Sequence, residues 1–443
     1  MDIRQFEDKG LAHYSYAIYS KATNQVVLVD PSRDLTPYLE FTHSKNAAIA
    51  GVIITHPHAD FVSGHLELHK KHGVAVYCSR LVGASFPYTG FDEGEEIVIG
   101  DIVLKALNTP GHSPDSISVV LVHRGHDAAV FTGDTLFIGD CGRPDLREGA
   151  GNITAAKEEL ARQMYYSLRE KLMVLPDDVL VFPAHGAGTL CGKSLSDAHS
   201  STIGAERVSN WSVQPMTPET FIEKLLADQP FVPKYFPFDV ALNRIGAPNL
   251  AEALAGVKRG NTGELEEGVT IIDTRPQEVF KQGHLPHAIN LQDGSKFETW
   301  LGSIVSPEEP FYLISGNDIH LKHVIGKASK IGYEAFIEAA IVLNDGDVLM
   351  PRMSIDDFRK HPENYTIVDV RMPSEVAGRK IFPNAINIPL DQLRERINDI
   401  PLDKPVVVHC AGGYRSAAAS SIVADKIGNS VPVYDLSEAV NTF

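Results

Sequence analysis

Residues 55–61 read Thr-His-Pro-His-Ala-Asp-Phe and continue from the apolar stretch 51–55, which predicts a strand. The two histidines and the aspartate stand at alternate positions after that strand, so their side chains can converge on one point. Imidazole and carboxylate groups together suit zinc, iron or manganese. The run therefore predicts a metal site at the end of a strand.

Three further residues of ligand type follow predicted strands. His112 stands in Thr-Pro-Gly-His-Ser, Asp134 in Phe-Thr-Gly-Asp-Thr, and His185 in Phe-Pro-Ala-His-Gly. Any one of these histidines taken alone is more simply explained as a surface or core residue. Taken with residues 55–61, they give four strand ends that each deliver such a residue to a loop with glycine or proline. Sheet scaffolds commonly carry active sites on such loops, so the set favours one shared site.

Before residue 210 the chain alternates short apolar stretches with turn signals. Many strands before a long helix predict a layered α/β domain, with sheets packed on each other. We predict an amphipathic helix over 155–171 and strands over 26–30, 51–55, 74–78, 97–104, 117–122, 128–132 and 179–182.

These runs resemble the metallo-β-lactamase superfamily over residues 10–200, which implies an αββα sandwich. Hydrolases of that superfamily usually carry histidine where this chain has Phe61, and that histidine binds a second metal. A phenylalanine ring has no lone pair, so the departure favours a single metal. It does not decide the family, because the persulfide dioxygenase branch often keeps a histidine there.

The runs are similar in particular to that persulfide dioxygenase branch. Its iron is held by the first histidine of the motif, the Pro-Gly-His histidine and the Thr-Gly-Asp aspartate. Carried onto this chain, the resemblance implies one Fe(II) held by His56, His112 and Asp134. Two histidines and one carboxylate with open positions form the facial triad of Fe(II) oxygen chemistry.

The remaining polar residues of the four runs are His58, Asp60 and His185. The resemblance makes them candidates to orient the ligands or to hold water. Direct coordination of a metal by these residues, above all by His58, stays open as the alternative.

The run Cys-Gly-Arg-Pro-Asp at 141–145 resembles a run of persulfide dioxygenases. Its Arg143 is a candidate to bind a substrate carboxylate through two hydrogen bonds, with a structural ion pair as the alternative. Cys191 follows His185 and precedes Lys193. It is a candidate sulfur acceptor with a lowered pKa, or else a plain buried thiol.

The second half of the chain contains an internal repeat. Residues 271–291 (IIDTRPQEVFKQGHLPHAINL) and 367–388 (IVDVRMPSEVAGRKIFPNAINI) share an apolar strand, Asp-x-Arg, a helix start and Ala-Ile-Asn. Each is followed by a second apolar strand, 311–315 and 406–410, that leads into a helix. Strand–helix–strand–helix at this spacing predicts two parallel-sheet α/β domains.

Cys410 ends the second strand of the later repeat, and a glycine-rich loop with Arg415 opens the following helix. Inward-pointing N–H groups and the arginine charge stabilise a thiolate or a persulfide there. With Asp369, Arg371 and Glu375, the loop resembles that of rhodanese sulfurtransferases. Cysteine-dependent phosphatases place one residue more between cysteine and arginine, so we favour sulfur transfer.

The earlier repeat has Ser-Gly-Asn-Asp at 315–318 and no cysteine, so it resembles an inactive rhodanese domain. We expect it to pack against the active domain, to orient it or to form a dimer contact. A proline-rich connecting segment, 211–250, precedes it. We therefore predict an N-terminal domain over 1–245, a first rhodanese copy over 246–347 and a second copy over 348–443.

The whole chain resembles bacterial fusions of persulfide dioxygenase and rhodanese of the sulfide-detoxifying type. The resemblance implies that O₂ oxidises a low-molecular-weight thiol persulfide to sulfite and thiol, with Fe(II). Cys410 then transfers a sulfane sulfur from persulfide to sulfite, which gives thiosulfate. One alternative is a mononuclear zinc thioester hydrolase of the glyoxalase II type fused to a sulfurtransferase. Another is a sulfur carrier or sensor without catalysis.

The formal charge of −17 argues against a nucleic-acid or anionic-membrane partner. The N-terminal residues lack an apolar signal core, and no apolar run is long enough to span a membrane. The four cysteines form no CxxC pair. We therefore expect a cytoplasmic protein with free thiols, and we expect a homo-oligomer because of the inactive copy.

Overall fold

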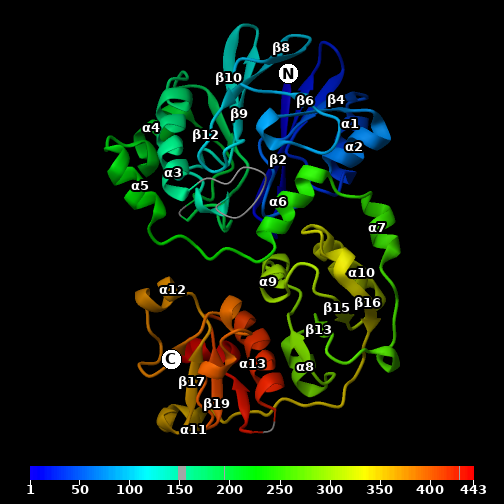
Figure 1. Ribbon diagram of the computed structural model, residues 1–443, viewed down its shortest axis with the longest axis vertical. Helices are drawn as coiled ribbons and strands as arrows, with labels where there is room; N and C mark the ends of the chain where they lie inside the picture. The colour runs from blue at the N-terminus through cyan, green and yellow to red at the C-terminus, as the bar shows by residue number, and fades with distance from the viewer. Residues whose placement is uncertain (148–155, 194, 429) are drawn as a thin grey trace. The chain divides into compact units, whose positions relative to one another are not determined.

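The computed structural model describes residues 1–147, 156–193, 195–428 and 430–443 (Figure 1). Its chain forms two compact units, residues 1–252 with 329–332 and residues 253–328 with 333–443. The first unit contains the metal-site runs, and the second contains the internal repeat. No helix in the described ranges is long and apolar enough to cross a membrane.

The first unit contains two mixed sheets, each of six strands within the described residues. One sheet follows chain order: β1 (Asp2–Asp8), β2 (His13–Ser20), β3 (Gln25–Val29), β4 (Ala48–Ile53), β5 (Ala75–Cys78) and β6 (Thr89–Gly90). The other sheet has the order β12 (Ser201–Thr202), β11 (Leu180–Pro183), β10 (His126–Gly133), β9 (Ile117–His123), β8 (Ile102–Asn108) and β7 (Glu96–Ile99).

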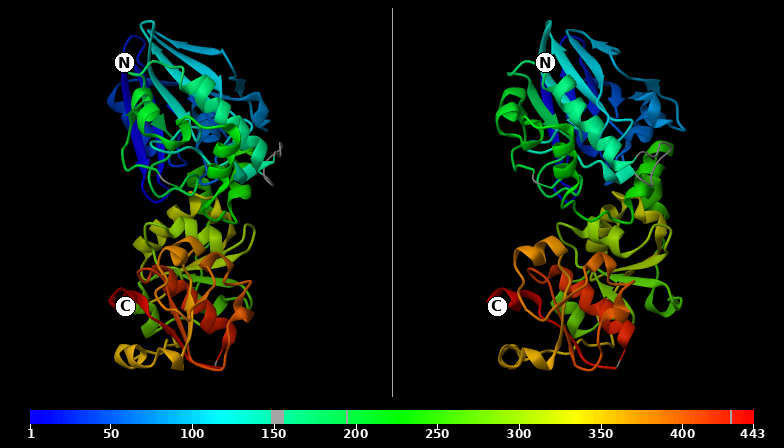
Figure 2. Two further views of the ribbon diagram at one scale, coloured as in Figure 1. Left: turned by 90° about the vertical axis from the view of Figure 1, so that its left-hand side faces the viewer. Right: turned by 60° about the vertical axis from the view of Figure 1, so that its left-hand side comes forward.

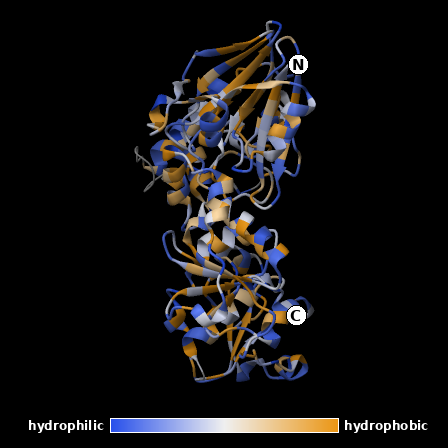
Figure 3. Cartoon of the chain, turned by 90° about the vertical axis from the view of Figure 1, so that its right-hand side faces the viewer, coloured by the Kyte–Doolittle hydropathy of each residue, from blue (hydrophilic) through white to orange (hydrophobic). Residues whose placement is uncertain are grey.

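The two sheets pack face to face through apolar side chains such as Ile18, Val27, Leu104 and Val119. Several strands of this unit are largely orange in Figure 3, with white and blue residues between the orange ones. Helices cover the outer faces: α1 (Thr36–Ser44) and α2 (His65–His72) pack on the first sheet, and α3 (Lys157–Tyr166) and α5 (Pro218–Leu226) pack on the second. This arrangement, which can be followed in Figure 2, confirms the predicted αββα sandwich.

Several predicted elements of this unit need correction. The prediction of one strand over 97–104 is wrong, because Gly100, at φ +62°, lies in the turn that separates the antiparallel strands β7 and β8. Strands β1 and β2 were not predicted. The predicted helix 155–171 appears as α3, followed by a wider helical turn, Ser167–Leu172, and Ala155 lies outside the described residues.

The proline-rich segment is largely helical. Helix α4 (Ile203–Ser209) precedes the segment. Helices α5 and α6 (Phe236–Ile245) lie within it, and α7 (Leu250–Gly256) begins at its last residue. The aromatic side chains of Tyr235 and Phe236 are buried. The segment therefore packs on its neighbours, as its aromatic residues predict.

The second unit holds two parallel four-stranded sheets of the same topology. The first sheet has the order β14 (Ala288–Asn290), β13 (Thr270–Asp273), β15 (Phe311–Ser315) and β16 (Ile337–Val342). The second has the order β18 (Ile386–Asn387), β17 (Thr366–Asp369), β19 (Val406–His409) and β20 (Val433–Asp435). The helices are α8 (Gln277–Gln282), α9 (Phe297–Ile304), α10 (Asp318–Ser329), α11 (Ile355–Lys360), α12 (Pro373–Gly378) and α13 (Tyr414–Ile427). The repeat thus confirms the prediction of two parallel-sheet α/β folds.

Candidate functional site

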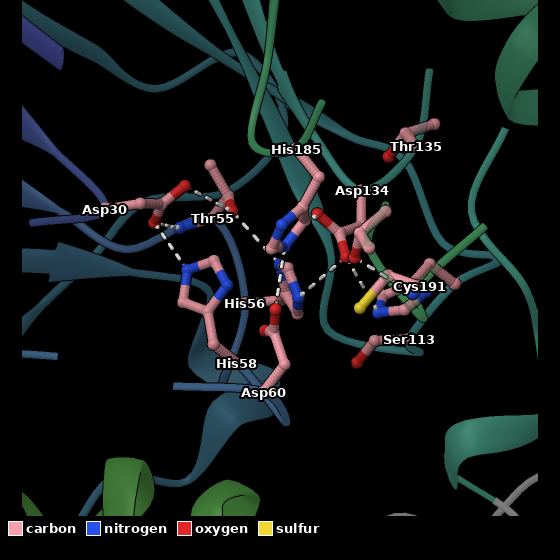
Figure 4. Close-up of polar contacts among 12 residues, drawn as sticks. Asp30, Thr55, His56, His58, Asp60, Ser113, Asp134, Thr135, His185 and Cys191 are labelled. Carbon is pink, nitrogen blue, oxygen red and sulfur yellow. Dashed lines mark hydrogen bonds and ion pairs between the residues drawn. The ribbon is translucent and has the colours of Figure 1, made fainter. Parts of the chain in front are cut away.

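The six predicted metal-site residues lie together at strand ends of the two sheets of the first unit. His56, His58 and Asp60 follow β4, and the other three residues follow or end β8, β10 and β11. All six are buried. Figure 4 shows the side chains of the five that it labels, His56, His58, Asp60, Asp134 and His185, pointing toward a common centre.

The three predicted iron ligands form one group. The Nε2 atom of His112 lies 3.5 Å from Oδ2 of Asp134, and the Nε2 atom of His56 lies 3.9 Å from the same oxygen. One ligand atom from each of the three residues lies within 4.8 Å of the others. The structure therefore brings His56, His112 and Asp134 together in the geometry of a candidate metal site.

The far ring nitrogens of both histidines are held by neighbouring groups. Nδ1 of His112 lies 2.8 Å from the carbonyl oxygen of Arg143, and Nδ1 of His56 lies 3.0 Å from Oγ1 of Thr55. Such bonds fix the ring orientation of a metal-binding histidine. They leave the Nε2 atoms facing Asp134.

The surroundings of the Asp134 carboxylate indicate whether a cation fits this site. Both of its oxygens are buried, and neither has a hydrogen-bond partner among the described residues. A buried carboxylate without such partners is costly unless a cation compensates its charge. Two imidazoles and one carboxylate are suitable ligands for Fe(II) or zinc. The residues present therefore fit a bound metal ion.

A second group lies beside the first and consists of His58, Asp60 and His185. The Nε2 atom of His185 lies 3.5 Å from Oδ2 of Asp60 and 3.5 Å from Oδ1 of Asp134. Burial raises the pKa of Asp60. The two groups are therefore in contact through His185 and Asp134. The second group can form ion pairs with the first or coordinate a metal ion itself.

Asp30, which the sequence analysis did not single out, orients His58. Its Oδ1 lies 3.0 Å from Nε2 of His58, and its two oxygens accept hydrogen bonds of 2.8 Å from the amide and the hydroxyl of Thr55. Burial opposes protonation of His58, but the nearby carboxylates, Asp30 first, raise its pKa above the ordinary value. In the sequence, Asp30 stands at the end of the predicted strand 26–30, directly before Pro31. A carboxylate at the end of a strand is the signal that could have indicated it.

Phe61 occupies the space beside the second group. Its buried ring lies 4.4 Å from the ring of His58 and 3.8 Å from the ring of His13, between centroids. His13 was not predicted as part of this region. Burial lowers its pKa well below the ordinary value. An apolar ring without a lone pair therefore lies beside the second group, and its role in limiting the site to one metal stays a prediction.

Arg143 is a buried arginine whose guanidinium is already paired. Its Nε and Nη2 atoms donate to the two carboxylate oxygens of Asp145 at 2.7 and 2.6 Å, and Nη1 donates to the carbonyl oxygen of Leu190 at 3.2 Å. This is the geometry of the structural ion pair, which was the alternative. Binding of a substrate by Arg143 stays a prediction.

Cys191 lies at the candidate metal site, with its Sγ within 4.8 Å of ligand atoms of Asp134 and His185. Burial raises the pKa of its thiol well above the ordinary value, and the carboxylates of Asp60 and Asp134 act in the same direction. Lys193 does not counter this, because its ammonium donates to backbone carbonyls. The expected lowered pKa is therefore wrong, and a role in sulfur transfer stays a prediction.

The cysteine loop, residues 410–416, follows β19 and ends in the first turn of α13 in the second unit. The N–H of Gly413 donates to Sγ of Cys410 at 3.1 Å, and the thiol is buried. Gly413 has φ +99°, a conformation that favours glycine. The guanidinium of Arg415 donates to both oxygens of Glu375 at 2.6 and 2.8 Å. The loop therefore surrounds the sulfur with a backbone donor and a fixed positive charge.

The first copy has Ser315 at the matching place. In the two sheets Asp273 pairs with Ile314 and Asp369 pairs with His409, so Ser315 and Cys410 are the next residues of equivalent strands. The hydroxyl of Ser315 is buried and has no hydrogen-bond partner among residues that the structure describes. Without a thiol at this position there is no persulfide carrier.

Family models match both halves of the chain. The model of the metallo-beta-lactamase superfamily matches residues 8–185. The model of the rhodanese-like domain matches residues 258–346 and again residues 354–439. The matched ranges coincide with the sandwich and with the two parallel sheets.

Curated relatives resemble the first half. The human mitochondrial persulfide dioxygenase ETHE1 is 30% identical over 185 residues, which are 41% of this chain and 67% of the human protein. The hydroxyacylglutathione hydrolase of Tolumonas auensis is 33% identical over 175 residues, which are 39% of this chain and 61% of that protein. Among solved structures, a metallo-beta-lactamase from Staphylococcus aureus subsp. aureus COL is 31% identical, with a TM-score of 0.69. It covers 77% of this chain and 99% of its own length.

Proposed function

Because this chain belongs to the metallo-beta-lactamase superfamily and carries two rhodanese-like domains, we propose that it is a sulfur-metabolising fusion enzyme. The first site oxidises a low-molecular-weight thiol persulfide with O₂ and water to the free thiol and sulfite. The second site uses Cys410 to transfer a sulfane sulfur from a persulfide to sulfite, which gives thiosulfate. The likeness to persulfide dioxygenases supports the first reaction.

The buried carboxylate of Asp134, faced by His56 and His112, is the observation that carries this proposal. These three residues would hold one Fe(II) per chain, and Phe61 argues against a second ion. Bound there, Fe(II) would supply the capacity to activate O₂.

The residues around these ligands prepare the site. Hydrogen bonds with the carbonyl oxygen of Arg143 and the hydroxyl of Thr55 fix the imidazole rings of His112 and His56. The group of His58, Asp60 and His185 provides buried polar atoms that can hold a proton or orient a bound molecule. Arg143 and Cys191 remain candidates to contact the persulfide.

At the second site the Cys410 thiolate attacks the outer sulfur of the donor persulfide. A new S–S bond forms to Cys410, the S–S bond of the donor breaks, and the donor thiolate leaves with the electron pair. The sulfur lone pair of sulfite then attacks the outer sulfur, and the Cys410 thiolate leaves. The N–H of Gly413 and the charge of Arg415 stabilise the thiolate before and after each step.

The proposal retains three domains, with boundaries at 245/246 and 347/348. The first copy is the degenerate one, since Ser315 cannot carry sulfur. A role in sulfide detoxification in the cytoplasm, as a homo-oligomer, belongs to the same proposal. The four cysteines are free and buried, which suits a reducing compartment.

The test combines metal analysis with O₂ uptake. The protein, loaded anaerobically with Fe(II), is given the persulfides of glutathione, coenzyme A, bacillithiol and cysteine in turn. We expect one iron per chain, and O₂ uptake with sulfite or thiosulfate as product for at least one donor. Protein that retains zinc alone after iron loading and consumes no O₂ with any donor would contradict the proposal.

A mononuclear zinc thioester hydrolase fused to a sulfurtransferase is the second candidate. The likeness to hydroxyacylglutathione hydrolase favours it. Hydrolysis of a glutathione thioester by zinc-loaded protein, with no O₂ uptake by the iron-loaded form, would select this candidate.

A further inference from the structure

The first copy contacts the C-terminal end of the second copy through a buried ion pair. Nζ of Lys281, on α8, lies 2.8 Å from Oδ2 of Asp435, and the two side chains are 14% and 1% exposed. The same ammonium donates to Oε1 of Gln277 at 3.0 Å. An ion pair this well buried holds its partners firmly, since either charge left alone would be costly.

Asp435 continues this contact toward the cysteine loop. Its Oδ1 accepts a hydrogen bond of 2.8 Å from the amide of Ser437, whose hydroxyl donates to Oε1 of Gln277 at 2.9 Å. The backbone of Ser437 and Glu438 lies against Gly413, where a Cβ would come within 3.2 Å of it. Lys281 and Gln277 of the first copy therefore hold Asp435 and Ser437, and Ser437 packs against Gly413.

A second contact reaches the next residue of the loop. The hydroxyl of Tyr414 donates to the carbonyl oxygen of Gln292 at 2.8 Å. Its ring lies directly on Gly294, where a Cβ would come within 2.7 Å of the ring. Gln292 and Gly294 belong to the first copy, so that copy also fixes the residue that begins α13.

We propose that the first copy is a positioning scaffold for Cys410. Lys281, through Asp435 and Ser437, and the Gln292–Gly294 turn, through Tyr414, hold Gly413 where its N–H donates to the sulfur. Lys281 and Tyr414 are positioning residues, because neither contacts the sulfur or its substrate. The inference rests on the proposed role of Cys410 as the sulfur carrier.

The test measures the Cys410 thiolate directly. Iodoacetamide alkylation of Cys410 in the full chain is followed against pH by peptide mass, so neither metal nor persulfide is needed. The variants are Lys281→Met, which leaves Asp435 without its cation, and Tyr414→Phe, which removes only a hydroxyl. The titratable groups near Cys410 are unchanged in both: Arg415, which interacts electrostatically with Cys410 and pairs with Glu375, and His409, whose Nδ1 lies 3.4 Å from the carbonyl oxygen of Cys410.

Two further variants serve as controls. Lys281→Arg keeps the positive charge and should restore the wild-type profile. Lys258→Met removes an exposed lysine of the first copy, which pairs with Glu338 at 2.9 Å. It should leave the profile unchanged.

We expect Lys281→Met to move the alkylation midpoint upward by about one pH unit, since the N–H of Gly413 is then held less firmly toward the thiolate. The alkylation rate at neutral pH then falls about tenfold in that variant. Tyr414→Phe should give a smaller shift in the same direction. Circular dichroism shows whether each variant is folded.

Folded Lys281→Met and Tyr414→Phe proteins with the midpoint of Lys258→Met would overturn the inference. Should Lys281→Met fail to fold, Tyr414→Phe alone decides, by the presence or absence of its shift. The proposed function is tested separately by O₂ uptake and thiosulfate. If the chain forms no thiosulfate but shows the predicted shifts, the positioning role of the first copy stands and the proposed function is wrong.

Discussion

The metal centre and the cysteine loop are built in opposite ways. Ligand candidates of the metal centre come from four strand ends that are far apart in the sequence, and only the sandwich brings them together. The cysteine loop is a single local run, 410–416, that one strand and one helix present. The two sites can therefore be damaged independently, and each should fail in its own way.

The two rhodanese copies provide an internal control for the second site. Both keep an Asp-x-Arg ion pair at the same place, with N–O distances of 2.7 Å for Asp273 and Arg275 and 2.6 Å for Asp369 and Arg371. In both, an asparagine amide donates to the carbonyl oxygens of that pair. What distinguishes them chemically is the loop. The two copies thus share the same frame, and only the second has a thiol at the loop position.

Cys410→Ser gives the second copy the hydroxyl of the first, and it should have the largest effect. We expect sulfur transfer from persulfide to added sulfite to fall on the order of 10³-fold or more, because the nucleophile is lost. O₂ uptake should stay at the wild-type rate, with sulfite accumulating in place of thiosulfate. The matched control Ser315→Ala should change neither rate. Thiosulfate formation by Cys410→Ser would remove Cys410 from the reaction and point to Cys191.

Asp134→Ala attacks the other site. Loss of the carboxylate should lower the iron content and reduce O₂ uptake at least about 100-fold, since even indirect supports of a metal site contribute 10–100-fold. Transfer to added sulfite should be unchanged. Iron analysis and an oxygen electrode measure the first two quantities. An Asp134→Ala protein that keeps its iron would show that other residues hold the metal.

Glu375→Gln weakens the cysteine loop without removing the thiol. Glu375 holds Arg415 through two hydrogen bonds, and with its charge gone the guanidinium is no longer fixed beside the sulfur. We expect sulfur transfer to fall about tenfold, as one charge-assisted hydrogen bond contributes about 1.5–3 kcal/mol. Steady-state rates with a persulfide donor provide the measurement. A rate equal to that of wild type would mean that Arg415 needs no anchor.

Phe61→His should have the smallest effect on the rate of O₂ uptake. Its specific effect should be on the metal content of the protein. The new imidazole would stand beside His58 and His13 and supply the ligand that the chain lacks. We expect metal content in excess metal to rise above that of wild type, while Phe61→Leu stays at the wild-type value. Equal metal content in Phe61→His and Phe61→Leu would show that the phenylalanine does not limit the site to one ion.

Features that depend on local patterns could be predicted from the sequence. The strands before His56 and Asp134, and the two repeats, are marked by apolar stretches with turn signals. Strand β2 was missed because His13, Ser15 and Ser20 interrupt its apolar residues, although all eight of its residues are buried. The turn at Gly100 was missed because both of its flanking stretches are apolar.

Features that depend on tertiary contacts could not be predicted in this way. Nothing near Cys191 in the sequence shows that the carboxylates of Asp60 and Asp134 act on its thiol, or that the ammonium of Lys193 donates to backbone carbonyls. His13 is distant in the chain from the residues it contacts. The ion pair of Lys281 and Asp435 joins two copies that look self-contained as sequences. In each case the partner is determined by packing between elements.

The most direct test of the central claim follows O₂ and sulfur products in one sample of iron-loaded protein. The account predicts one O₂ consumed per sulfite formed when persulfide is added to the Cys410→Ser chain. It predicts the same O₂ uptake, with thiosulfate as product, for the wild-type chain. Absence of O₂ uptake by the iron-loaded wild-type chain with every persulfide donor would contradict it.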